Sequence, residues 1–270
     1  RQMDDVLYEA RMLAESGVKE LIVVAQDTSR YGTDLPGHKR LLAPLLRELC
    51  KIEKLHWIRV HYVYPDEIDD ELIDTIAQEE KIVKYLDIPI QHCNDTILKK
   101  MNRRGSGEFV AALLAKLRER IPGLVIRTSI ITGLPGEGEA EFAELCEFLK
   151  KQRMERVGAF PFSPEEGTPA AKMDYPDSDV AQQRAEMVEE IQSRIMDDYN
   201  ASMVGRTLEV LVDGYDEDAE QFYGRTYADS PDIDGRVWIA CDEPLTVGDF
   251  VQVTIDAVED GDLCGYVAEE

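Results

Sequence analysis

The stretch that most constrains the fold is residues 124–137 (LVIRTSIITGLPGE), an apolar run that ends in a Gly-Leu-Pro-Gly turn and continues into acidic residues. β-Branched side chains such as Val125 and Ile130 suit a strand covered on both faces. Gly133 and Gly136 permit backbone angles and close approaches that a side chain would block. The stretch therefore predicts a strand, a tight turn and a helix, although a role in packing alone would explain the same pattern.

The same alternation of strand and helix patterns extends from residue 4 to about residue 170. Apolar runs predict five strands, near residues 21, 57, 85, 125 and 157. Such alternation implies a parallel sheet or barrel with right-handed crossovers. Because five strands do not close an eight-stranded barrel, we expect an open sheet, a partial barrel or a truncated chain.

The pattern changes in the last third of the chain. Residues 174–203 predict a linker and a long helix, and from residue 204 the apolar residues alternate with a period of two. Short strands separated by Gly, Asp and Pro turns are typical of a small antiparallel β-barrel. The expected organisation is an α/β domain over residues 1–173, the linker and long helix, and a β-barrel over residues 204–270.

Charge and cysteine content narrow the class of protein. The formal net charge of −25 opposes binding to a phosphate backbone and favours basic partners. The five cysteines lie more than twenty residues apart, so none has the short spacing of a zinc or iron–sulfur motif. Their odd number favours reduced thiols in the cytoplasm. No apolar stretch approaches the roughly 20 residues that span a bilayer.

Polar side chains follow two of the predicted strands. Gln26, Asp27 and Thr28 come after the first strand, and Gln91 and His92 come after the third. Parallel barrels keep their chemistry at the carboxyl ends of the strands, which makes these residues candidates for a site. The alternatives are that Asp27 or Thr28 caps a helix and that His92 is a hydrogen-bonded loop histidine.

Several ordered segments resemble the radical S-adenosylmethionine methylthiotransferases, and the resemblance covers essentially the whole chain. They are residues 26–32 (QDTSRYG), 64–65 (YP), 85–92 (YLDIPIQH), 98–103 (LKKMNR), 131–137 (ITGLPGE) and 162–170 (FSPEEGTPA). The terminal barrel resembles a TRAM domain. The resemblance implies a partial parallel (β/α) radical SAM barrel followed by a TRAM β-barrel.

Residues 165–170 and 230–235 are similar to the branch that adds a methylthio group to the β-carbon of an aspartate of ribosomal protein uS12. An acidic chain suits that basic protein substrate, since the region from residue 205 has 18 acidic residues and three arginines. The alternatives are the branch that modifies tRNA adenosine, for which a basic stripe is expected, and a non-catalytic acidic adaptor that binds ribosomal protein.

The resemblance also implies cofactors: S-adenosylmethionine, two 4Fe-4S clusters in the intact enzyme, and an electron donor as partner. The Cys-x-x-x-Cys-x-x-Cys loop that holds the cluster in this family is absent from the sequence. We therefore expect a fragment that begins just downstream of that loop. It should carry neither metal ligands nor catalytic residues of its own and should be inactive alone.

By the same resemblance, two sets of residues face ligands. The cofactor set is Gln26, Asp27, Thr28, Gln91, His92, Arg127, Thr132 and Gly133. The substrate set is Ser163, Glu165, Glu166, Asp232 and Asp234. Arg127 would pair with the methionine carboxylate of the cofactor, and Thr132 with Gly133 would line its adenine or ribose side. The alternatives are that Arg127 forms a structural ion pair and that Gly133 only shapes the turn.

Overall fold

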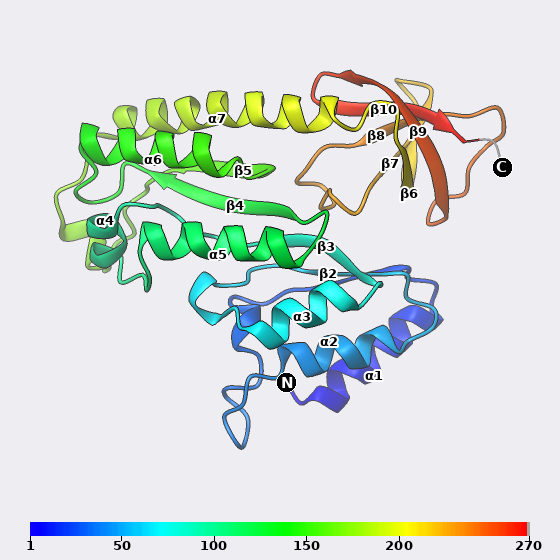
Figure 1. Ribbon diagram of the computed structural model, residues 1–270, viewed down its shortest axis with the longest axis horizontal. Helices are drawn as coiled ribbons and strands as arrows, with labels where there is room; N and C mark the ends of the chain where they lie inside the picture. Colours follow the sequence, from blue (N-terminus) through cyan, green and yellow to red (C-terminus); the bar gives the residue numbers. More distant parts are fainter. Residues whose placement is uncertain (269–270) are drawn as a thin grey trace.

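The computed structural model describes residues 1–268 and contains a five-stranded parallel sheet and a closed five-stranded barrel (Figure 1). The sheet has the order β1-β2-β3-β4-β5, as successive right-handed crossovers predict. Its strands are β1 (Glu20–Val23), β2 (Trp57–Val60), β3 (Ile82–Asp87), β4 (Val125–Thr132) and β5 (Arg156–Pro161). All five predicted strands are present, and they form an open, partial barrel.

Helices cover one face of this sheet, because apolar stripes on the helices meet alternate residues of the strands. They are α1 (Met3–Glu15), α2 (Leu42–Cys50), α3 (Asp70–Gln78), α4 (Asp95–Lys100), α5 (Gly107–Arg120) and α6 (Glu139–Gln152). Ile58, Val60, Ile126 and Ile130 point into this core and are almost fully buried. Short 3₁₀ turns follow three of the strands, namely η1 (Thr28–Arg30), η2 (Pro65–Glu67) and η3 (Ala170–Lys172).

The long helix α7 (Ser178–Ala201) runs from beside α6 to the terminal barrel (Figure 1). The sequence predicted a linker and a long helix over residues 174–203. In the structure it packs against β4, β5 and α6, and it buries Ala181, Ala185 and Val188. The helix is therefore part of the folded body of the sheet.

The terminal barrel is closed, with the strand order β10-β8-β7-β6-β9. Its strands are β6 (Thr207–Asp216), β7 (Gln221–Arg225), β8 (Val237–Ala240), β9 (Phe250–Glu259) and β10 (Asp262–Val267). Four neighbouring pairs are antiparallel, as predicted, and β8 pairs with β10 in parallel. β7 ends at Arg225 because the next residue, Thr226, enters a turn closed by Asp229.

The terminal barrel packs against the other face of the sheet, near the amino-terminal ends of β2 and β4. Trp57, Tyr85 and Val125 of the sheet pack there against Leu211 and Ala228 of the barrel. The ring of Phe250 meets the edge of Trp57, with 4.7 Å between centroids. The carboxyl ends of the strands lie beyond this contact. No helix among residues 1–268 is long and apolar enough to cross a bilayer.

Candidate functional site

The carboxyl ends of β1 and β3 bring together part of the predicted cofactor set. Gln26 and Asp27 follow β1, and the next residue, Thr28, donates its amide to the carbonyl of Tyr62 beyond β2 (3.0 Å). Gln91 extends β3 and pairs with β4 through two backbone hydrogen bonds of 2.9 Å. Because parallel strands end at one edge, these polar residues lie on a common rim.

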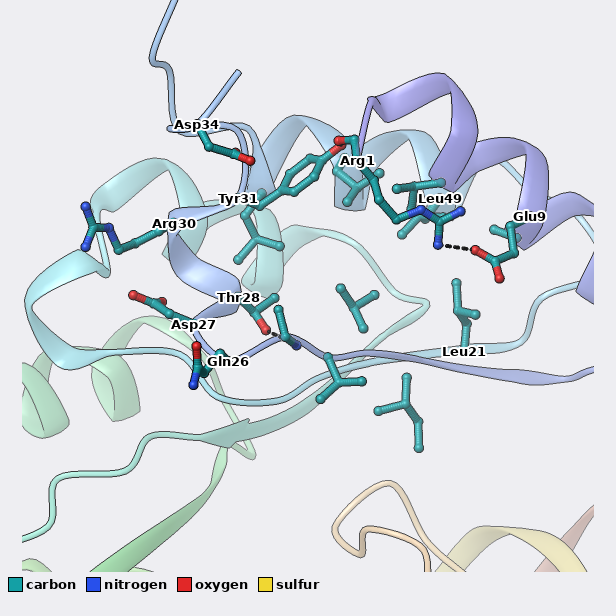
Figure 2. A pocket seen from close by; sticks show the side chains of 18 of the residues that line it. Arg1, Glu9, Leu21, Gln26, Asp27, Thr28, Arg30, Tyr31, Asp34 and Leu49 are labelled. Carbon is teal, nitrogen blue, oxygen red and sulfur yellow. Dashed lines mark hydrogen bonds and ion pairs between the residues drawn. The ribbon is translucent and has the colours of Figure 1, made fainter. Parts of the chain in front are cut away.

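A cavity of about 660 Å³ opens beside β1, between α1, η1 and α2 (Figure 2). Leu21 and Leu49 form part of its apolar wall, and Gln26 and Asp27 lie at its polar end. Thr28 is buried, and its hydroxyl accepts a hydrogen bond from the amide of Ala25 (3.0 Å). Thr28 thus closes the turn after β1. In this turn the side chain of Gln26 is exposed, and that of Asp27 is partly exposed and accepts a hydrogen bond from the hydroxyl of Ser29.

Gln91 has the clearest unused hydrogen-bonding capacity on this rim. Its backbone is in the left-handed region, with φ at 69°, which is uncommon for a residue other than glycine. Its side-chain oxygen Oε1 is buried and has no hydrogen-bond partner among residues 1–268. Such a group is costly unless a ligand or a water supplies a donor. The geometry of Gln91 therefore suits contact with a bound molecule.

Thr132 and Gly133 lie against α7, and His92 faces Glu137 in the turn after β4. The hydroxyl of Thr132 donates to the carbonyl of Ala181 (2.8 Å). Gly133 has φ at 74°, and a Cβ there would collide with that of Ala181. The buried ring of His92 accepts the amide of Asn94 at Nδ1 (3.0 Å). These three residues therefore support the backbone of the rim through contacts within the protein.

A buried carboxylate, Glu137, organises the turn after β4. It accepts hydrogen bonds from the amide of Gly133 (2.9 Å) and from Nη1 of Arg184 (2.9 Å). Its Oε2 lies 3.3 Å from Nε2 of His92, outside hydrogen-bonding geometry. The side chain of Arg184 is 6% exposed and also bonds Glu139 (2.6 Å). Sequence reasoning missed Arg184, because nothing distinguishes it from the other charged residues of α7.

Arg127 and Asp234, expected to bind cofactor and substrate separately, lie in one ionic cluster. Arg127 is 3.3 Å from Asp87 and 3.8 Å from Asp234. The carboxylate of Asp234 accepts the hydroxyl of Tyr85 (2.7 Å) and the amide of Ser230 (2.8 Å), and its side chain is 5% exposed. The cluster joins the sheet to the barrel, so the structural ion pair that was the alternative for Arg127 is present.

Two further buried pairs, both missed in the sequence, extend this join. Arg156 binds Asp229 (2.7 Å). Arg59 binds Glu20 and the carbonyl of Tyr227, each at 2.8 Å. Charged residues in strands normally face solvent. Arg59 and Arg156 are buried because the barrel covers the face of the sheet from which they project.

The remaining predicted substrate residues are accessible. Ser163, Glu165 and Glu166 lie in the exposed loop after β5. Asp232 is exposed near the join, with φ at 62°. These side chains are therefore available to a partner.

The described residues contain no group of three His, Cys, Asp or Glu side chains placed to hold a metal ion. All five cysteines are free thiols. Burial raises the pKa of Cys93 to about 12, so that this thiol stays protonated at neutral pH.

The buried His61 should make the free energy of unfolding depend on pH. It is buried beside Ser230, and burial lowers its pKa below the usual 6.5. The native state thus holds His61 neutral, and unfolding takes up a proton at low pH. Its contribution is full above about pH 6.5 and decreases as the pH falls below that value. The drop in unfolding free energy from about pH 7.5 to about pH 5.5 should be smaller in His61→Asn than in the unaltered chain. Equal drops would contradict this assignment.

Comparison with known proteins follows the same division of the chain. Residues 1–149 match the radical SAM superfamily, and residues 204–267 match the TRAM domain. Coproporphyrinogen III oxidase (HemN) of Escherichia coli, a radical SAM enzyme, shares the fold, with a TM-score of 0.53, 19% identity, and coverage of 72% of this chain and 47% of that one.

Curated relatives match almost the whole chain. The ribosomal protein uS12 methylthiotransferase RimO of Acetivibrio thermocellus is 46% identical over an alignment that covers all of this chain and 60% of that protein. The protein of the same name from Lachnoclostridium phytofermentans is 48% identical over 97% of this chain and 60% of its own length. The chain thus spans about 60% of the length of these relatives.

Proposed function

The chain belongs to the radical SAM superfamily, and on that premise we propose that it is part of an enzyme that adds a methylthio group to an aspartate of ribosomal protein uS12. The observation that carries this proposal is 46–48% identity to uS12 methylthiotransferases across both the sheet and the terminal barrel. In this proposal the sheet contributes the cofactor-facing rim and the barrel contributes to substrate docking.

The rim residues fit S-adenosylmethionine. The orphaned Oε1 of Gln91 needs a donor, and the ammonium, ribose hydroxyl and adenine amino groups of this cofactor each offer one. Gln26 and Asp27 present further polar atoms at the next strand end, while Thr28, His92, Thr132 and Gly133 would hold the rim in shape. When bound, the cofactor supplies one-electron chemistry at a carbon–hydrogen bond.

The chain does not fit a 4Fe-4S cluster in the same way, because its described residues provide no ligand group. No step through a cluster is therefore assigned to these residues. The intact enzyme would need its clusters and an electron donor from elsewhere, and a ribosomal-protein substrate would place the enzyme in the cytoplasm.

The charge of the accessible surface supports a protein substrate over tRNA. The region from residue 205 carries 18 acidic residues, and one of its three arginines, Arg225, is buried against Glu20 and Asp213. A nucleic-acid-binding barrel would instead need exposed basic side chains. Glu165, Glu166 and Asp232 are the exposed acidic residues that we assign to docking.

A titration of the chain with recombinant uS12 and with a tRNA anticodon stem-loop tests this proposal. We expect saturable binding of uS12 that weakens from low to physiological salt, and no binding of the RNA. The variant Glu165→Gln/Glu166→Gln should weaken uS12 binding about threefold to tenfold at low salt, since exposed charges at the edge of an interface act mainly through electrostatic complementarity.

The matched control is Asp4→Asn/Asp5→Asn, which removes the same charge from the exposed start of α1. It should leave uS12 affinity within about twofold of the unaltered chain. Binding of the stem-loop in place of uS12 would favour the tRNA branch of the family.

A further inference from the structure

A second cavity, of about 230 Å³, lies on the rim beyond η1 and η2. Its floor is apolar and includes Ile90 and Leu98. Its walls carry three arginines, Arg30, Arg103 and Arg104. None of the three belongs to the predicted sites, and their convergence is unusual in a chain with a net charge of −25.

Arg103 is held at this cavity by the way in which α4 ends. Asn102 adopts the left-handed conformation, with φ at 54°. The amide of Asn102 bonds the carbonyl of Lys99 (3.1 Å), and the amide of Arg103 bonds that of Leu98 (2.8 Å). This pair of bonds is the Schellman arrangement, which closes a helix and defines the direction of the chain after it. The backbone of Arg103 is therefore well defined.

The guanidinium of Arg103 is under-used by its surroundings. It donates one hydrogen bond, from Nη1 to the carbonyl of Pro89 (3.1 Å), and lies over the ring of Tyr64 at 4.9 Å. Within residues 1–268 no carboxylate oxygen lies within 4 Å of it, and burial lowers its pKa. Arg103 is partly exposed at the cavity, so its four remaining N–H groups are available to an anion there.

The charges around Arg103 favour a single negative charge as the ligand. Three carboxylates share the cavity wall, namely Asp27, Asp66 and Glu67. Glu67 is already paired with Arg40, which approaches from outside the cavity. Arg30 lies 3.9 Å from Glu67, and Arg104 lies 3.9 Å from Asp66, so each forms a loose ion pair without a hydrogen bond and keeps N–H groups for a further anion. A dianionic phosphate would meet stronger repulsion from these carboxylates than a carboxylate would.

We propose that this cavity is a subsite for a carboxylate, held by Arg103 with Arg30 and Arg104. Two N–H groups of a guanidinium match the two oxygens of a carboxylate. The inference rests on the proposed function, in which the modified residue of the substrate is an aspartate. The occupant is then the side-chain carboxylate of that aspartate, and Arg103 is a positioning residue that orients it relative to the adjoining cofactor rim.

The test compares two blocked amino acids, N-acetyl-aspartate N-methylamide and its asparagine counterpart. Binding to the unaltered chain is followed by NMR of the arginine Nε–H groups. We expect the Arg103 signal to shift with the aspartate compound and the affinity to exceed that of the asparagine compound by about tenfold, as for a charge-assisted pair. Equal affinities would overturn the proposal.

Three variants separate recognition from folding. Arg103→Gln should reduce the preference for aspartate to about twofold or less. Arg104→Gln removes an exposed charge that holds no hydrogen bond and should reduce the preference about threefold. Arg194→Gln, on the exposed face of α7, should leave the preference unchanged. A preference that survives both Arg103→Gln and Arg104→Gln would overturn the proposal.

Competition identifies the source of the anion. If S-adenosylmethionine displaces the aspartate compound, the carboxylate of the cofactor occupies the cavity and the assignment to substrate is wrong. Tighter binding of inorganic phosphate than of the aspartate compound would overturn the choice of ligand. If uS12 binds the unaltered chain and Arg103→Gln equally well, the subsite fails while the proposed function stands; if uS12 does not bind the unaltered chain, the proposed function itself fails.

Discussion

Glu137→Ala should lower the free energy of unfolding by about 3–5 kcal/mol, the range for removal of one partner from a buried ion pair. The side chain of Glu137 is fully buried, and its loss removes the acceptor of the amide of Gly133 and the buried carboxylate that pairs with Arg184. Arg184 keeps only the exposed carboxylate of Glu139 and the backbone carbonyl of residue 137. Urea denaturation followed by circular dichroism measures the change. Because the same carboxylate orders the turn after β4, binding of S-adenosylmethionine should weaken as well.

Two comparisons isolate the buried pair. Arg194→Ala, which breaks the exposed pair of Arg194 with Glu190 on α7, should change stability by less than about 0.5 kcal/mol. Glu137→Gln/Arg184→Met removes both charges and should recover a large part of the loss, since the cost comes from a buried cation that has lost its buried carboxylate. A loss below about 1 kcal/mol for Glu137→Ala would contradict this role and show that Glu139 and the carbonyl of residue 137 are enough to hold Arg184.

Arg59→Ala should cost about 3 kcal/mol and loosen the terminal barrel from the sheet. The side chain is completely buried, bonds Glu20 and the carbonyl of Tyr227, and stacks on Tyr85 at 4.7 Å. Its removal leaves a cavity and an unsatisfied carbonyl at the join between the two bodies. Glu20 keeps Arg225 as a partner, which limits the loss.

Amide hydrogen exchange distinguishes loosening from general destabilisation. In the unaltered chain, β7 and β4 should open with similar free energies, as expected for one cooperative unit. In Arg59→Ala the amides of β7 should become less protected than those of β4. The control Lys54→Ala, which breaks an exposed pair with Glu15, should leave both unchanged. Equal loss of protection in β4 and β7 of Arg59→Ala would contradict a role at the join.

Much of the fold was predictable because the information is local. The strand at residues 125–132 and its turn follow from apolar periodicity and two glycines, and the same reasoning located the other strands of the sheet. The polar strand ends at Gln26 and Gln91 were also predictable, because parallel strands present their carboxyl ends at one edge.

The partners of individual charges were not predictable. Arg127 and Asp234 were assigned to different ligands, yet 107 positions apart in the chain they meet in one cluster. Arg103 entered the sequence argument only within a resembling segment, and its exposure to a cavity depends on how α4 ends beside η2.

The sequence by itself determined the order of strands and helices, the closed terminal barrel and the family resemblance, since each depends on periodicity or motif over a few residues. Only the tertiary structure decided which polar residues face the rim and which form buried contacts with other parts of the protein. Thr132 faces α7, His92 faces Glu137, and Arg59 and Arg156 face the barrel, because the neighbours that satisfy a buried polar group come from distant parts of the chain. An ion pair is stabilised by the distance and burial of its two groups, and neither quantity is encoded in local spacing.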